Sequence, residues 1–208
     1  MFSLLLTYFT IIVIINSFNL IDGIDGLAGS LGVMATALFG FYFLRADLIP
    51  YAIMAFALTG SLLAFLIFNY HPARIFMGDT GSMLIGMVSA ILVIKFINVA
   101  EVSGVGSPIR EAPAIGFSVL LIPLMDTLRV FGIRIFHRRS PFIPDRNHIH
   151  HLMLDKGLSH NAITFALVAA NLAFVGFSYY FRDIMEAAVI ILIEACVFFA
   201  GIAALYYT

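Results

Sequence analysis

Long stretches of this sequence contain no charged residue, and they constrain its fold more than any other feature. An α-helix needs about 20 predominantly apolar residues to cross the roughly 30 Å of hydrocarbon in a bilayer. Seven stretches approach this length: residues 1–21, 26–44, 48–73, 80–94, 112–125, 157–181 and 187–208, the last interrupted by Glu194. They are continuously apolar rather than alternating, which excludes a transmembrane β-barrel. The sequence therefore predicts an all-α fold, a polytopic transmembrane helical bundle of about seven spans.

Composition excludes several other classes of protein. Hydrophobic residues make up 62% of the 208 residues and charged residues only 11%, whereas ordinary soluble domains carry roughly 25% charged residues. The formal net charge is −1 and no basic stripe is present, so we expect no nucleic-acid partner. No Lys or Arg precedes Arg45, which disfavours a signal peptide in the first stretch. We expect residues 1–208 to form a single integral membrane domain.

The order of spans predicts which polar segments share a side of the membrane. Two spans separate the segment around Asp22 from that around Asp79, and two more separate Asp79 from residues 132–160. The three segments therefore lie on one side, which carries most of the Arg and Lys. Positive charge collects on the cytoplasmic side, so these loops are expected to face the cytoplasm.

The first polar segment, residues 16–30, has an amide or carboxylate at every third position: Asn16, Asn19, Asp22 and Asp25. Glycines at positions 23, 26 and 29 indicate that the helix loosens here, so that backbone can approach a ligand. Ionisable groups near hydrocarbon cost roughly 2.5–3.5 kcal/mol on insertion scales and usually mark function. Capping of the next helix is the alternative role, but one such residue would suffice for it.

The second polar segment, FNYHPARIFMGDTGS (residues 68–82), places Asp79 at the start of a predicted helix. A capping role is the alternative for Asp79, but it does not explain the neighbouring Asn69, His71 and Phe76. Carboxylate and amide oxygens around Asp79 would suit Mg²⁺. The string DTGS also occurs in aspartic proteases, whose β-rich fold does not match, and an intramembrane aspartyl protease is a distant alternative.

The third polar segment, from Asp126 to His160, contains a group of basic side chains: Arg146, His148, His150 and His151. Arginine forks and histidine donors suit phosphate oxygens. Zinc is an alternative ligand of the histidines, but no cysteine or separated fourth ligand accompanies them. Carboxylates and amides opposite this group would fit a divalent metal that holds a pyrophosphate. A transporter and a non-catalytic membrane remnant are the alternatives, although transporter sites lie near the midplane.

The strings NSFNLIDGIDGLA, FNYHPARIFMGDTGS and DRNHIHH, in this order, resemble the polyprenyl-phosphate N-acetylhexosamine-1-phosphate transferases (WecA/MraY type, glycosyltransferase family 4) over about residues 1–180. The resemblance implies transfer of a sugar 1-phosphate, GlcNAc-1-phosphate in the WecA-like branch that HIHH favours, from a UDP-HexNAc to undecaprenyl phosphate. UMP is released, and cell-envelope polysaccharide synthesis such as that of lipopolysaccharide O-antigen begins. The alternative is the UDP-MurNAc-pentapeptide transferase of peptidoglycan synthesis. The implied location is the bacterial cytoplasmic (inner) membrane, and the implied partners are the UDP-sugar and the polyprenyl-phosphate lipid, with a homodimer as a further option.

The same resemblance assigns roles residue by residue. Asp79 is the expected Mg²⁺ ligand, with Asn19 reaching the same ion and Mn²⁺ as the alternative ion. Phe76 is placed to stack on uracil. The expected catalytic residues are Asp79, Asp22, Asp25, His148, His150 and His151. The expected nucleotide and substrate contacts are Asn16, Asn19, Asp22, Gly23, Asp25, Asn69, Phe76, Arg146, His148, His150 and His151.

The sequence departs from the family in one respect. Family members carry an earlier cytoplasmic loop with two adjacent aspartates, and no Asp-Asp pair occurs in this sequence. We therefore expect the chain to be the C-terminal part of such an enzyme, lacking about four N-terminal spans of the family, and its activity alone is in doubt.

Overall fold

A computed structural model describes residues 2–101, 108–138 and 147–207 of the chain. Helices account for 81% of these residues, and no strand occurs among them. The long helices are α1 (Phe2–Ile21), α2 (Leu27–Arg45), α3 (Ile49–Asn69), α4 (Gly78–Val99), α8 (His160–Phe181) and α9 (Ala187–Tyr207). Three shorter helices are α5 (Ala112–Val119), α6 (Leu121–Phe136) and α7 (Ile149–Asp155).

Six of the described helices are long and apolar enough to cross a membrane, and a seventh span is obtained if α5 and α6 count as one. The all-α polytopic bundle predicted from the sequence is thus confirmed. The fifth predicted span, residues 112–125, differs from the expectation because α5 and α6 meet at Leu120 with a bend of 78°. The uncharged stretch is therefore part of a broken helix, and the helix continues beyond residue 125 to Phe136.

The break at Leu120 is stabilised by an amide from another helix. Asn171 of α8 is fully buried; its Oδ1 accepts a hydrogen bond from the backbone N–H of Ile122 (2.9 Å). Its Nδ2 donates to the carbonyls of Ser118 (3.0 Å) and Val119 (3.1 Å). Backbone groups freed inside a membrane must find partners in the protein, and one side chain supplies three here.

Helix α2 lies at the centre of the bundle, with 67% of its membrane-spanning window buried. It packs against α3, α4 and α8, whereas α1 packs against α4 and α6. The crossing of α1 and α4 is tight, because a Cβ on Gly86 would lie only 2.6 Å from the Cα of Ile15. The apolar outer faces of α1, α3 and α9 remain exposed, as expected of surfaces that contact lipid.

Glu194 is a buried carboxylate inside α9, and it accepts hydrogen bonds from Ser118 of α5 (2.8 Å) and Ser178 of α8 (2.9 Å). These contacts join three helices within the apolar region. They agree with a structural role for Glu194 inside the apolar region rather than a role at the polar segments.

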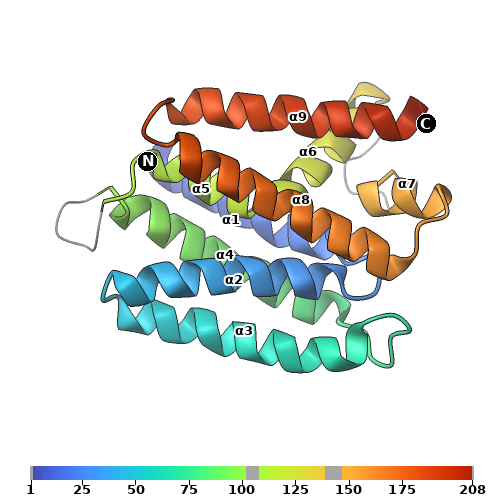
Figure 1. Cartoon of the computed structure of the whole chain (residues 1–208), viewed down its shortest axis with the longest axis horizontal. Coiled ribbons are helices and arrows are strands. Elements are labelled where there is room, and N and C mark those ends of the chain that lie inside the picture. The colour runs from blue at the N-terminus through green and yellow to red at the C-terminus, as the bar shows by residue number, and fades with distance from the viewer. Residues whose placement is uncertain (1, 102–107, 139–146, 208) are drawn as a thin grey trace.

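The polar segments gather at one end of the bundle. In Figure 1 the turn between α1 and α2, the loop between α3 and α4, and helix α7 all lie at the right-hand end. Segments that are more than a hundred residues apart in sequence therefore form one surface.

Candidate active site

A hydrogen-bonded group of polar side chains joins the end of α1 to the start of α4. The Nδ2 atom of Asn19 donates to Oδ1 of Asp79 and to Oγ of Ser82, each at 3.1 Å. Asp79 lies in the first turn of α4, as predicted, and that helix has no side-chain N-cap hydrogen bond. Capping therefore does not account for Asp79, whose exposed carboxylate is held by Asn19 instead.

A second carboxylate lies near Asp79. Asp22 follows the last residue of α1, and burial, together with the charge of Asp79, raises its pKa from 3.8 to about 6. This environment fits a divalent cation, because a cation would relieve both the desolvation of Asp22 and the charge of Asp79 that acts on it. The donor set around Asp79 and Asp22 thus suits a hard, oxygen-binding metal. Asn19 presents its amide nitrogen to Asp79, so its direct metal ligation stays a prediction.

The turn between α1 and α2 is fixed by residues from the next loop. Gly26 has a φ of 80°, a conformation that glycine adopts without strain, and the Tyr70 ring would lie 3.0 Å from any Cβ there. The Gly26 N–H donates to Oδ1 of Asn69 (3.0 Å), while Nδ2 of Asn69 donates to the carbonyl of Ile75 (2.9 Å). Asn69 is 5% exposed. In this structure Asn69 links the turn between α1 and α2 to the loop between α3 and α4 through these two hydrogen bonds. Its contact with a nucleotide stays a prediction.

Phe76 and Asn16 are two further residues that the sequence predicts to contact the ligand. Phe76 is 79% exposed, so its ring is accessible to a stacking base. Asn16 donates to the carbonyl of Ile12 in its own helix (2.7 Å). The structure brings Asn19, Asp22 and Asp79 together, and no hydrogen bond among the described residues joins Asn16 to them.

His150 reaches the turn from the opposite side. Its side chain is 1% exposed, and neither ring nitrogen has a hydrogen-bond partner among the described residues. A Cβ added to Gly23 would overlap its Nε2 atom, so the ring edge rests on the backbone between Asp22 and Asp25. Burial and the charge of His151 lower the pKa of His150 to about 3. It is therefore a neutral hydrogen-bond donor or acceptor at pH 7, and its contact with phosphate stays a prediction.

His148 is held by a carboxylate that sequence reasoning did not select. Asp126 of α6, 1% exposed, accepts hydrogen bonds from Nδ1 of His148 (2.8 Å) and the backbone N–H of Ile149 (3.0 Å). Arg129 donates to the same carboxylate at 2.9 Å and also to the carbonyl of Asn147. An aspartate inside an apolar run, one turn before an arginine, was the available signal. Asp126 and Arg129 together position the start of α7.

The remaining histidines of the third segment complete this arrangement. The rings of His148 and His150 stack with an interplanar angle of 6° and centroids 5.8 Å apart. The His151 ring lies 4.3 Å from that of His150. Arg146, also predicted as a phosphate contact, lies outside the described residues.

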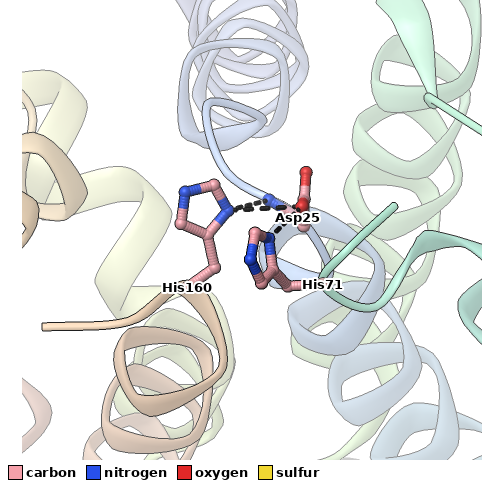
Figure 2. A group of neighbouring side chains, drawn as sticks. All are labelled: Asp25, His71 and His160. Carbon is pink, nitrogen blue, oxygen red and sulfur yellow. Dashed lines mark hydrogen bonds and ion pairs between the residues drawn. The ribbon is translucent and has the colours of Figure 1, made fainter. Parts of the chain in front are cut away.

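Asp25 contacts two histidines whose role the sequence did not indicate. Figure 2 shows that His71, from the loop after α3, and His160, the first residue of α8, both point toward the Asp25 carboxylate. Oδ2 of Asp25 lies 2.7 Å from Nδ1 of His71 and 3.4 Å from Nδ1 of His160. Burial alone would raise the pKa of Asp25, but hydrogen bonds from His71 and Ala73 and the neighbouring histidine charges lower it below its usual value. No local pattern in the sequence links positions 25, 71 and 160.

The apolar bundle with its polar end is that of a multi-pass integral membrane protein. Residues 1–97 match glycosyl transferase family 4, and this match, together with the relatives described below, supports membership of that family. The family is metal-dependent in general, which agrees with the paired carboxylates described above.

Several curated relatives are similar to most of the chain. The undecaprenyl-phosphate alpha-N-acetylglucosaminyl 1-phosphate transferase of Yersinia pestis is 32% identical over 181 residues, which is 84% of this chain and 48% of the relative. The corresponding transferase of Escherichia coli strain K12 is also 32% identical, over 84% of this chain and 47% of the relative. The decaprenyl-phosphate N-acetylglucosaminephosphotransferase of Mycobacterium leprae is 36% identical, over 77% of this chain and 44% of the relative. The chain thus spans about half the length of the curated relatives it matches.

Proposed function

We propose that the protein transfers GlcNAc-1-phosphate from UDP-GlcNAc to a polyprenyl phosphate at the cytoplasmic face of a bacterial inner membrane. The observation that carries this proposal is the meeting of Asn19 of α1, Asp22 just after α1 and Asp79 of α4, next to a turn on which the buried His150 rests. The relatives, which are named as GlcNAc-1-phosphate transferases of undecaprenyl or decaprenyl phosphate, support the same conclusion.

The reaction balances as a single displacement at phosphorus. An oxygen of the polyprenyl phosphate forms a bond to the β-phosphorus of UDP-GlcNAc, and the bond from that phosphorus to the bridging oxygen breaks. The electron pair stays on the bridging oxygen, which leaves as part of UMP. The attacking phosphate is already anionic, so it needs little help from a general base. The protein's contribution is therefore to position the groups and to neutralise their charge.

Each group of side chains has a place in this reaction. Asp79 and Asp22 would hold Mg²⁺, which supplies charge neutralisation to the pyrophosphate when bound. Asn19 orients the Asp79 carboxylate through its hydrogen bond. Gly23 and the exposed Phe76 ring are the proposed nucleotide contacts. Neutral His150 and the anchored His148 would face the sugar and diphosphate end as hydrogen-bonding groups rather than as cations.

Membranes that contain the protein provide the test, supplied with Mg²⁺, polyprenyl phosphate and radiolabelled UDP-GlcNAc. The expected result is a labelled lipid product with one UMP released per transfer. Because loss of outer-shell metal partners alone costs about 10–100-fold, Asp79→Asn should lower the rate by more than about 100-fold. Asp183→Asn, which removes a carboxylate just beyond the far end of α8, is the matched control and should keep the rate.

Two results would refute parts of this proposal. Transfer from UDP-MurNAc-pentapeptide but not from UDP-GlcNAc would assign the protein to peptidoglycan synthesis. Full activity of Asp79→Asn would remove Asp79 from the metal site, and a failure to form any lipid-linked product would reject the transferase itself.

A further inference from the structure

Three side chains from distant segments meet on the exposed side of the turn between α1 and α2. Asp25 belongs to the turn, His71 to the loop between α3 and α4, and His160 to the first turn of α8 (Figure 2). One donor atom from each lies within 4.8 Å of the other two. Two imidazoles and one carboxylate converge here on a common point.

The three donor atoms lie close to one another, and metal binding would take up Nδ1 of His71 without the proton it now shares with Asp25. The backbone N–H of Asp25 donates to Nδ1 of His160 at 3.4 Å, so this nitrogen carries a lone pair when His160 is neutral. The same nitrogen lies 3.4 Å from Oδ2 of Asp25, so that lone pair also faces a carboxylate oxygen. A cation bound between Oδ2 of Asp25 and Nδ1 of His160 would replace the long hydrogen bond from the Asp25 N–H and form a ligand bond to each of the two atoms.

The separations fit a small tetrahedral ion. Zinc lies about 2.0–2.1 Å from nitrogen or oxygen ligands, which holds neighbouring ligands about 3.3 Å apart. The distance from His160 to Asp25 is 3.4 Å and that from His71 to Asp25 is 2.7 Å. Of these two distances the second must lengthen, and the His71 side chain is 47% exposed on a loop.

We propose that Asp25, His71 and His160 form a binding site for a zinc-like divalent cation, with a fourth position open to water. Imidazole ligands select zinc, copper, iron or nickel, whereas carboxylates and water suit magnesium and manganese. The cluster therefore differs in preference from the oxygen-rich group at Asp79 and Asp22. Carboxylate plus two histidines with one open position is a common zinc ligand set.

The surroundings hold the carboxylate in place. The backbone N–H of Ala73 donates to Oδ2 of Asp25 at 3.3 Å, and Oγ1 of Thr164 donates to the Asp25 carbonyl at 3.2 Å. Such outer partners orient metal ligands and contribute to affinity. A bound ion would join the turn, the loop and α8 as a cross-link, so zinc is expected to raise the unfolding temperature.

Cobalt provides a direct probe, because Co²⁺ bound by imidazole and carboxylate absorbs visible light. The purified full chain is titrated with Co²⁺ in detergent, without nucleotide, since Asp25 is also a proposed nucleotide contact. We expect a saturable visible absorption that zinc abolishes and excess Mg²⁺ does not. His71→Gln and His160→Gln should each weaken Co²⁺ binding by more than about tenfold and remove the rise in unfolding temperature that zinc causes.

Control variants remove imidazoles elsewhere. His137→Gln, at the end of α6, and His151→Gln, in the other histidine group, should leave the absorption unchanged. Loss of the signal in His151→Gln but not in His71→Gln would place the metal at α7 and overturn the proposal. Absence of any signal in the unaltered chain, or a signal that both cluster variants retain, would overturn it as well.

X-ray absorption of the zinc-loaded, unaltered chain decides the matter if the cluster variants fail to fold. Two imidazoles and oxygen ligands are expected in the first shell, and the same spectrum should be obtained from His151→Gln. An all-oxygen shell, or a shell with more than two imidazoles, would contradict the site.

Discussion

Nδ1 of His148 lies 2.8 Å from Oδ2 of Asp126, and both side chains are almost fully buried. A carboxylate only accepts hydrogen bonds when ionised, so the proton of a neutral His148 sits on Nδ1 and leaves a lone pair on Nε2. Because Asp126 also accepts from the N–H of Ile149, one side chain fixes both the tautomer of His148 and the start of α7. Asp126 is thus a positioning residue for the histidine group.

Replacing Asp126 by Asn removes the negative charge of this side chain and keeps its size and shape. Arg129, 7% exposed, would lose its carboxylate partner, and breaking a buried pair typically costs about 3–5 kcal/mol. We expect lower resistance to unfolding in mixed micelles, together with a mixture of His148 tautomers in nitrogen NMR spectra. Transfer activity should fall by about 10–100-fold. Asp155→Asn, at the exposed end of α7, is the control; a pure Nδ1–H tautomer in Asp126→Asn would contradict the positioning role.

The carboxyl group of Asp22 should make stability depend on pH. Its pKa is about 6 in the folded protein and 3.8 in the reference state, so the folded state holds this proton more tightly than the unfolded state. As pH rises from about 4 to above 6, the unfolded state ionises first and stability falls.

In chelator, the unfolding temperature of Asp22→Asn should decrease less over this interval than that of the unaltered protein. Asp79→Asn should have a smaller effect in the same direction, since it removes the repulsion but not the burial. Parallel curves for all three proteins would rule out this contribution.

Gly23→Ala should disturb the contact with His150. The added methyl group would overlap Nε2 of a side chain that is 1% exposed and has no room to withdraw. Overpacking of this kind typically costs about 1–3 kcal/mol, which thermal unfolding would detect. Gly132→Ala on α6 is the matched control, because nothing lies within 4 Å of its Cβ. Equal unfolding temperatures for the two variants would show that His150 can move aside.

Asn171→Leu should destabilise the break between α5 and α6. The change removes the partner of one N–H and two carbonyls around Leu120, and each buried group left without a partner costs about 1–3 kcal/mol. Faster amide exchange at Ile122 and a lower unfolding temperature are expected. The exposed Asn161, on the same helix, provides the control as Asn161→Leu. Unchanged exchange at Ile122 would mean that water or a rearranged backbone replaces the amide.

The sequence was sufficient for the spans but not for the break between α5 and α6. Hydropathy reports whether a segment tolerates lipid, and residues 112–125 do so whether straight or bent. The bend depends on Asn171, 51 residues beyond Leu120 in the chain, and no local pattern carries that information. The sequence therefore predicted an apolar segment at this position but gave no sign of its bend.

The candidate site divides in a similar way. Asn19, Asp22 and Asp79 could be selected because carboxylates and amides at the ends of apolar runs are costly unless they are used. Whether an imidazole is charged depends instead on its burial, so the neutrality of His150 appeared only in the structure. The grouping of Asp25 with His71 and His160 likewise depends on how three segments fold together.

The close crossing of α1 and α4 at Ile15 and Gly86 has a consequence for biogenesis. The first of these helices to be synthesised must remain in the bilayer while α2 and α3 are still being made, because its partner is the fourth helix in the chain. Until α4 inserts, Asn19 lacks both of its hydrogen-bond acceptors. The proposed metal-binding pair is thus assembled late, because it forms only after α2 and α3 have been made and α4 has inserted.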